Sequence, residues 1–210
     1  MKQEFRESIS IKSQNIVFSL LVLTLVSLML SSCEKTYTPK PKSYPRIVYP
    51  SKGYQPYLNN SCPFTFDYPL YANIVRDTSF FEEKVENPCW INIVFPQFGG
   101  TIHVSYEDVH SQEQMAKLLD DAHTLTYKHT KKAESIDPVE VENKYGVKGL
   151  IYDVGGNAAS NIQFYVTDMD HHFLRGALYF NTVPNIDSMG PVVDFVKKDM
   201  DHLIETFHWK

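Results

Sequence analysis

Residues 91–106 read INIVFPQFGGTIHVSY, and this stretch decides the fold. Apolar and polar residues alternate on both sides of Pro96–Gly100, a pattern typical of strands that bury one face. The glycines of Pro96–Gly100 supply the turn between the two strands. The stretch therefore predicts an antiparallel hairpin formed by Cys89–Phe95 and Thr101–Tyr106.

Further strands are predicted on both sides of this hairpin. The same alternation occurs at Phe64–Tyr68, Leu150–Val154, Ile162–Val166 and Phe173–Asn181. The last three of these segments follow one another through turn-forming residues, so they predict an antiparallel meander. Ala72–Pro88 carries mixed charges and is interpreted as a weak strand and an exposed loop.

A helix is predicted between the hairpin and the meander. Ser111 and Gln114 have the spacing of a capping box, in which each side chain satisfies a free amide group of the first turn. Apolar residues then recur at helical spacing as far as Ala133 and define a buried face. His129 falls on that face, where a hydrogen-bonded core histidine is favoured over a ligand or a base.

A second helix is predicted near the end of the chain. Pro184–Met189 leads into it, with Asp187 or Ser188 as the expected N-cap and Pro191 in the first turn. The predicted buried face consists of Val193, Val196, Met200 and Leu203.

The order of these elements predicts the α+β class. We expect an antiparallel sheet of about six to seven strands, with a C-terminal three-stranded meander, packed with two main helices. The stretch FTFDYP at residues 64–69, the middle helix, the meander and the final helix ending in Glu205–Phe207 resemble the PsbP and Mog1-like α/β/α sandwiches. Since fold does not fix function, this resemblance implies an architecture alone.

The N-terminus has the layout of an export signal. Basic residues precede an uncharged run from Ile16 to Leu30, which is shorter than the roughly 20 residues of a bilayer-spanning helix. The following LSSC at residues 30–33 resembles the lipobox of bacterial lipoproteins, in which the cysteine is lipidated. An ordinary signal peptide with a chance cysteine is the alternative. We predict a signal peptide at residues 1–32 and lipidation of Cys33.

The rest of the chain divides into a tether and one domain. Residues 33–45 form the lipidated cysteine and a polar, proline-containing tether, and residues 46–210 form a single globular domain. The lysines of the tether suit a solvated linker better than contact with acidic head groups. The net charge of −5 at pH 7 argues against nucleic acid as a partner.

Two cysteines remain once Cys33 is assigned to lipid. Cys62 and Cys89 are expected to form a disulfide, because thiols of exported proteins meet in an oxidising compartment. Two buried free thiols are the alternative. Zinc is disfavoured, because no second close pair of Cys or His completes a tetrahedral set.

The sequence offers two candidate catalytic or metal-binding sites, and each has a simpler structural interpretation. Ser160 ends a glycine-containing turn, but that turn lacks the Gly-x-Ser-x-Gly elbow of a hydrolase and the lysine of a phosphate loop. His171 and His172 are adjacent on an extended segment, so their side chains point apart and suit a solvated turn better than a metal site. We expect no enzyme activity, no catalytic residue, no metal and no cofactor.

The same turn is the stretch best suited to contact with a partner protein. Gly155 and Gly156 permit close approach of a second backbone, and Asn157 and Ser160 are small and polar. Arg175 on the neighbouring strand adds a charged group at the edge of this surface. A tight hairpin packed under another loop is the equal alternative.

Five segments of the chain carry a closer resemblance. They are CPFTF (62–66), PCWINI (88–93), YKHT (127–130), GGNAAS (155–160) and RGALYFN (175–181). In this order they resemble the gliding motility lipoprotein GldD family. The resemblance implies a lipid-anchored protein on the periplasmic side of the cell envelope, with the outer membrane favoured over the inner. It supplies no catalytic residues.

Two functions therefore remain open at the level of sequence. The resemblance implies a noncatalytic structural or assembly subunit of the gliding machinery, linked to type IX secretion. Its partners would be the membrane, through the N-terminal lipid, and other envelope motility or secretion proteins. The alternative is a small-ligand-binding or hydrolytic envelope lipoprotein, which a concave pocket with converging polar groups would favour.

Overall fold

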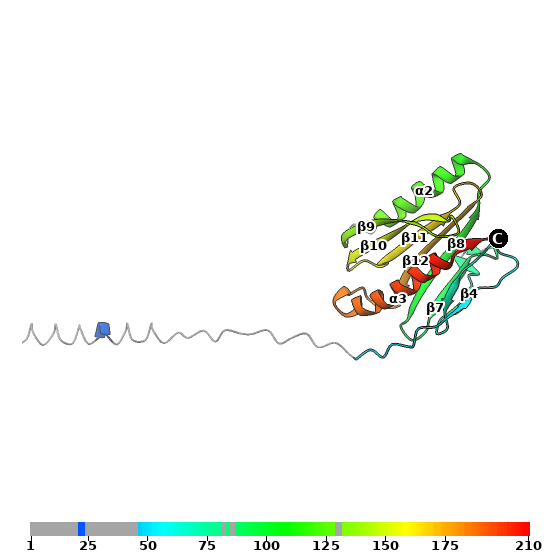
Figure 1. Ribbon diagram of the computed structural model, residues 1–210. Helices are drawn as coiled ribbons and strands as arrows, with labels where there is room; N and C mark the ends of the chain where they lie inside the picture. The colour runs from blue at the N-terminus through cyan, green and yellow to red at the C-terminus, as the bar shows by residue number, and fades with distance from the viewer. Residues whose placement is uncertain (1–20, 24–45, 81–82, 85–86, 129–131) are drawn as a thin grey trace, which may run out of the picture. The chain divides into compact units, whose positions relative to one another are not determined.

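The computed structural model describes residues 21–23, 46–80, 83–84, 87–128 and 132–210 (Figure 1). The chain divides into two units, residues 1–45 and a folded domain from Arg46 to Lys210. Within the described ranges, no helix is both long enough and apolar enough to cross a membrane.

A seven-stranded antiparallel sheet forms the centre of the folded domain, in the order β4-β7-β8-β12-β11-β10-β9 (Figure 1). These strands are β4 (Asn73–Arg76), β7 (Ile91–Phe95), β8 (Gly100–Asp108), β9 (Ala133–Glu142), β10 (Lys148–Gly156), β11 (Ile162–Thr167) and β12 (His172–Phe180). Two long helices pack on the sheet, α2 (Gln112–Tyr127) and α3 (Ile186–Thr206). The predicted α+β class is confirmed.

The hairpin predicted from residues 91–106 is present as β7 and β8. Ile93 lies opposite Ile102, and alternate residues of both strands are buried. Gly99 has a φ angle of 61°, a conformation that glycine adopts at little cost. The meander β10-β11-β12 is also confirmed.

The two helices lie on opposite faces of the sheet (Figure 1). Successive residues of a strand point to opposite faces, and in β12 the buried Leu174 belongs to the core cluster of Val196 and Met200 of α3. Its neighbour Phe173 instead packs in the cluster of Met115 of α2. The arrangement is an α/β/α sandwich.

Helix α2 begins as predicted and ends earlier than predicted. The Ser111 hydroxyl oxygen accepts from the amide of Gln114 at 3.2 Å, and the Gln114 side chain accepts from the amide of His110 at 2.9 Å. The helix ends at Tyr127, so the predicted continuation to Ala133 is wrong. Ala133 is the first residue of β9, an edge strand whose charges and Pro138 obscured its pattern in the sequence.

Helix α3 begins two or three residues before the predicted N-cap. Asn185 is the N-cap, and its carbonyl accepts from the amides of Ser188 and Met189 at 3.2 and 2.9 Å. Asp187 and Ser188 therefore lie inside the helix, and Pro191 lies beyond its first turn. The predicted buried residues of this helix are confirmed as Val193, Val196, Met200 and Leu203.

The strand predicted at Phe64–Tyr68 lies outside the main sheet. It is divided into β2 (Phe64–Thr65), which pairs with β13 (His208–Trp209), and β3 (Asp67–Pro69), which pairs with β1 (Tyr54–Pro56). The remaining short hairpin consists of β5 (Ser79–Phe80) and β6 (Glu83–Lys84). The predicted weak strand within Ala72–Pro88 corresponds to β4, at one edge of the sheet.

Candidate functional site

Two residues singled out in the sequence lie outside the described part of the structure. Cys33 and its tether fall within residues 24–45, and His129 falls within residues 129–131. The lipidation of Cys33 therefore stays a prediction.

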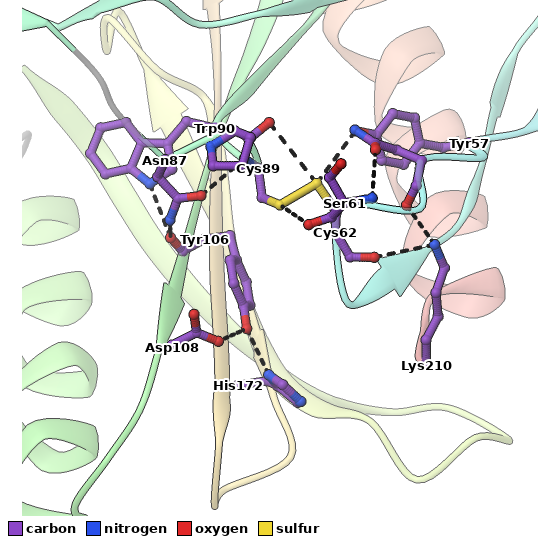
Figure 2. Close-up of a disulfide and its surroundings, with 12 residues drawn as sticks. Tyr57, Ser61, Cys62, Asn87, Cys89, Trp90, Tyr106, Asp108, His172 and Lys210 are labelled. Carbon is purple, nitrogen blue, oxygen red and sulfur yellow. Dashed lines mark hydrogen bonds between the residues drawn. A yellow bond between two sulfur atoms is a disulfide. The ribbon is translucent and has the colours of Figure 1, made fainter.

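Cys62 and Cys89 form a disulfide in the structure (Figure 2). Their Cα atoms are 5.5 Å apart, and both residues are buried. The bond joins the segments that precede β2 and β7. Buried in this way, the pair serves to fix two loops to each other.

The C-terminus is held beside this disulfide (Figure 2). The Lys210 ammonium group donates to the carbonyl oxygens of Asn59 at 2.7 Å and Cys62 at 3.2 Å. The Lys210 amide donates to the carbonyl of Pro63 at 2.8 Å. The last residues therefore close the same corner of the domain as the disulfide does.

The proposed contact turn is tightly packed against β9. Gly156 has a φ angle of 80°, and a Cβ atom at Gly155 would lie 2.7 Å from the Ser135 hydroxyl oxygen. A Cβ atom at Gly156 would lie 2.9 Å from the amide nitrogen of Glu134. Both glycines are therefore required by the internal packing of this turn.

The polar side chains of this turn bond within the domain. Ser160 is 0% exposed, and its hydroxyl donates to the carbonyl of Ile162 at 3.3 Å. The exposed Asn157 accepts from the amide of Ile186 through Oδ1 at 2.9 Å, which caps the start of α3. Of the turn residues named in the sequence, Asn157 offers the most surface to a partner.

Arg175 lies on the same face of β12 as Phe173, the face that packs against α2. Its Nη2 donates to Oε1 of Gln163 at 2.7 Å. Within the described ranges, the buried Nε of Arg175 and the buried Nε2 of Gln163 have no hydrogen-bond acceptor. Burial lowers the pKa of Arg175, and the nearby hydroxyls of Tyr179 and Tyr152 act in the opposite direction. The structure thus leaves two buried donors without an acceptor among the described residues, one on the partly buried Arg175 and one on Gln163.

A second polar group centres on Tyr106 (Figure 2). The Tyr106 hydroxyl donates to Asp108, and Nδ1 of His172 lies 2.8 Å from the same oxygen. Because the one hydroxyl proton goes to Asp108, the oxygen accepts from Nδ1–H of His172. Burial, followed by the hydrogen bond to Asp108, raises the pKa of Tyr106, so its hydroxyl stays protonated at neutral pH.

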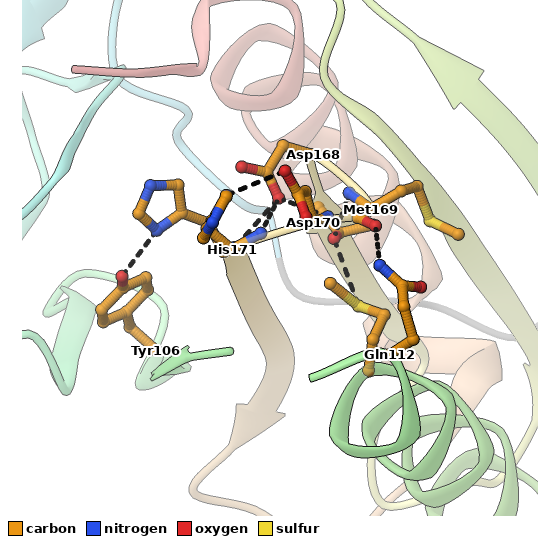
Figure 3. Close-up of polar contacts among 9 residues, drawn as sticks. Tyr106, Gln112, Asp168, Met169, Asp170 and His171 are labelled. Carbon is orange, nitrogen blue, oxygen red and sulfur yellow. Dashed lines mark hydrogen bonds and ion pairs between the residues drawn. The ribbon is translucent and has the colours of Figure 1, made fainter. Parts of the chain in front are cut away.

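The turn that carries the adjacent histidines is organised by Asp168 (Figure 3). Its Oδ1 accepts from the amides of Asp170, His171 and His172 at 2.9–3.0 Å. Burial alone would raise the pKa of Asp168, but these hydrogen bonds outweigh burial and lower it. Asp168 therefore acts as a structural acceptor. In the described part of the chain, no cluster of three or more His, Cys, Asp or Glu residues is arranged to hold a metal ion.

One buried polar cluster was not predicted from the sequence. Asp199 of α3 is 1% exposed and accepts hydrogen bonds from Lys52, Tyr54 and Tyr71. An acidic residue three positions after the buried Val196 was the available signal, because that spacing places Asp199 on the buried face.

A groove of about 510 Å³ lies beside the edge of the sheet. It is lined by Glu140, Glu142, Lys148, Tyr165 and Thr167, among others. Burial, followed by the nearby charge of Glu140, raises the pKa of Tyr165. The groove thus brings polar groups from β9, β10 and β11 together.

Comparison with known proteins identifies the chain by family. The model of the family "Gliding motility lipoprotein GldD" matches residues 34–209. The solution structure of cyanobacterial PsbP (CyanoP) from Synechocystis sp. PCC 6803 is similar at 14% sequence identity, with a TM-score of 0.46, over 77% of this chain and 95% of that chain. No curated protein matches the chain. Because the family model spans almost all residues after the predicted signal peptide, this chain belongs to the gliding motility lipoprotein GldD family.

Proposed function

We propose that this protein is a lipid-anchored, periplasm-facing component of the gliding machinery, linked to type IX secretion, and that it acts as a noncatalytic structural or assembly subunit. The observation that carries the proposal is the family match over residues 34–209. The lipobox ending at Cys33 supplies the anchor, and the outer membrane is the proposed site of attachment.

Two features of the domain support a noncatalytic role. The hydroxyl of Ser160, the one nucleophile considered from the sequence, is buried and donates to the carbonyl of Ile162. Oδ1 of Asp168 accepts hydrogen bonds from three backbone amides, which lower the pKa of Asp168 and make it a weaker base. These groups are used to hold turns in place.

We further propose that Asn157 and Arg175 contribute to contact with an envelope partner. Asn157 is exposed, and the buried Nε of Arg175 has no hydrogen-bond acceptor among the described residues. In this proposal Gly155, Gly156 and Ser160 act by fixing the shape of the turn.

The test uses a strain of the source bacterium that lacks the gene and is complemented with variants. Cys33→Ser is expected to abolish acyl labelling, release the protein from the membrane fraction and stop gliding. Retention of acyl labelling and membrane attachment would refute the anchor. Separation of inner from outer membranes, applied to the wild-type protein, tests the proposed site.

The contact proposal requires a variant that leaves α3 capped. Asn157→Asp keeps the Oδ1 acceptor for the amide of Ile186, so it is combined with Arg175→Met. We expect this double variant to stay in the membrane and to lose gliding and partner recovery from crosslinked envelopes. Arg46→Met, a change at an exposed arginine, is the control. Normal gliding with normal partner recovery in the double variant would refute the contact proposal.

The groove beside β9 supports a second candidate, binding of a small ligand. Its two carboxylates, ammonium group and tyrosine hydroxyl come from different strands and face one space. Native mass spectrometry of the protein extracted from its own envelope tests this function. A small-molecule adduct present in the wild type and lost in Glu140→Gln supports it, and a wild-type spectrum without any adduct contradicts it.

A further inference from the structure

Arg175 and Gln163 each carry a buried hydrogen-bond donor, and the two residues are neighbours. Gln163 is 1% exposed, and its Oε1 accepts from Nη2 of Arg175 at 2.7 Å. Its other terminal atom, Nε2, is buried without an acceptor among the described residues, and so is Nε of Arg175. Both atoms are hydrogen-bond donors, so what the site lacks is acceptors.

The site also carries an uncompensated positive charge. No ion pair links Arg175 to a carboxylate in the part of the chain that the structure describes. The hydroxyls of Tyr179 and Tyr152 lie near the guanidinium and oppose the effect of burial on the pKa of Arg175. A buried charge without a counter-ion destabilises a domain, because it loses hydration and gains no partner.

Arg175 is partly exposed as a residue, although its Nε atom is buried. In the sheet it lies opposite Ser105 of β8 and Tyr165 of β11. His103, two residues from Ser105 on the same face, is exposed and lies beside the ring of Tyr179 at 5.7 Å between centroids. His103 therefore lies on the same face of the sheet as Arg175, on the neighbouring strand β8.

The number and type of donors select the ligand. A guanidinium fork and an amide N–H₂ group match an acceptor with two oxygens and a single negative charge. A phosphate dianion would require further cations, whereas Asp77 places a negative charge near His103. The matching group is a carboxylate.

We propose that Arg175 and Gln163 form a binding site for a carboxylate group, which accepts hydrogen bonds from Arg175 Nε and Gln163 Nε2. The carboxylate comes from an acidic side chain of an envelope partner or from a free small acid. A partner protein as the source rests on the proposed function. Binding of a carboxylate at this site does not depend on a role in gliding.

Acetate is the probe for the binding chemistry. The lipidated full-length protein is melted in detergent micelles, with sodium acetate replacing sodium chloride at constant ionic strength. With a dissociation constant on the order of 50 mM, about 500 mM acetate raises the melting temperature by roughly 3–6 °C. Arg175→Met is expected to lose this rise, and Arg46→Met, a change at an exposed arginine, is expected to keep it.

Gln163→Glu is the sharper variant, because it places a carboxylate where Oε1 already meets Arg175. We expect it to melt at a higher temperature than the wild type in chloride and to lose the response to acetate. The same acetate response in the wild type and Arg175→Met overturns the proposal. So does a full acetate response in Gln163→Glu, and so does a wild type that does not respond.

A second measurement distinguishes the two sources. A photo-crosslinking amino acid replaces the exposed His103 in living cells, with and without Arg175→Met. A crosslink to an acidic segment that disappears with Arg175→Met assigns the carboxylate to a partner protein. A small-acid adduct in native mass spectra, present in the wild type and absent from Arg175→Met, assigns it to a free acid. If neither the crosslink nor the adduct is found, the proposal that this site binds a carboxylate in living cells is overturned.

Discussion

The ammonium group of Lys52 donates a hydrogen bond to the carboxylate of Asp199, which lies 147 residues further along the chain. The same ammonium group donates to the carbonyl of Phe195 at 3.0 Å and lies 3.6 Å from the centroid of its ring. Tyr54 and Tyr71 donate to the same carboxylate. The segment that follows the tether in the sequence is thereby fixed to the middle of α3.

Replacement of Asp199 is expected to loosen this attachment. Asp199→Ala leaves the ammonium group of Lys52 and two tyrosine hydroxyls without their acceptor, so the free energy of unfolding should fall by about 3–5 kcal/mol. Urea denaturation followed by circular dichroism measures the loss. Asp194→Ala, at an exposed position of the same helix, is the control and should change stability by less than about 0.5 kcal/mol. Equal effects of the two variants would contradict a structural role for Asp199.

The Asp199 cluster also predicts how stability changes in alkali. Burial, followed by the hydrogen bond to Asp199, raises the pKa of Tyr54 from 10.0 to about 12. A raised pKa in the folded state means that the stabilising contribution is complete below pH 10.0 and is lost as the pH rises through about 12.

The ultraviolet absorbance of tyrosinate follows this titration. Tyr54→Phe should remove one late-titrating group, and Asp199→Asn should move that group toward lower pH. A titration curve that Asp199→Asn leaves unchanged would show that Asp199 does not perturb Tyr54.

The disulfide is expected to contribute strongly to stability. The chain-entropy model gives about 3–4 kcal/mol for the loop from Cys62 to Cys89, whose ends are 27 residues apart in sequence. Cys62→Ala combined with Cys89→Ala should lower the free energy of unfolding by this amount. A reductant should lower the urea midpoint of the wild type and leave that of the double variant unchanged. Equal midpoints for oxidised and reduced wild type would rule out the contribution.

Gly156 is expected to resist substitution. Its φ angle of 80° and the approach of Glu134 disfavour any side chain, so Gly156→Ala should destabilise the domain by about 1–3 kcal/mol. Gly190→Ala is the matched control, since no atom lies within 4 Å of a Cβ atom built there, and it should stabilise α3 by about 0.5–1 kcal/mol. Thermal denaturation compares the two, and a neutral Gly156→Ala would show that the turn can relax.

The hairpin and the helix start were predictable because their causes are local. Ile93 and Ile102 are buried by an alternation that only one register of a half-buried strand satisfies. The bond from the Gln114 amide to Ser111 depends on two residues three positions apart. Such signals need no knowledge of the rest of the chain.

The missed elements depend on pairing partners that are distant in sequence. β9 has four acidic residues and a proline, and it forms a strand because β10 supplies partners along one side, with one register shift between Val154 and Gly156. β2 leaves the main sheet because β13, at the end of the chain, pairs with it. Long-range pairing overrides weak local preference in both cases.

The sequence alone determined the class of fold, the predicted address at Cys33 and the family resemblance, since each is read from neighbouring residues or from their order. Tertiary structure decided what the individual side chains do. It buried Ser160, directed Asn157 to the amide of Ile186 and left Arg175 beside Gln163 with donors unsatisfied. Burial and hydrogen-bond partners depend on strands and helices brought together from across the chain, and those contacts give a polar residue its role.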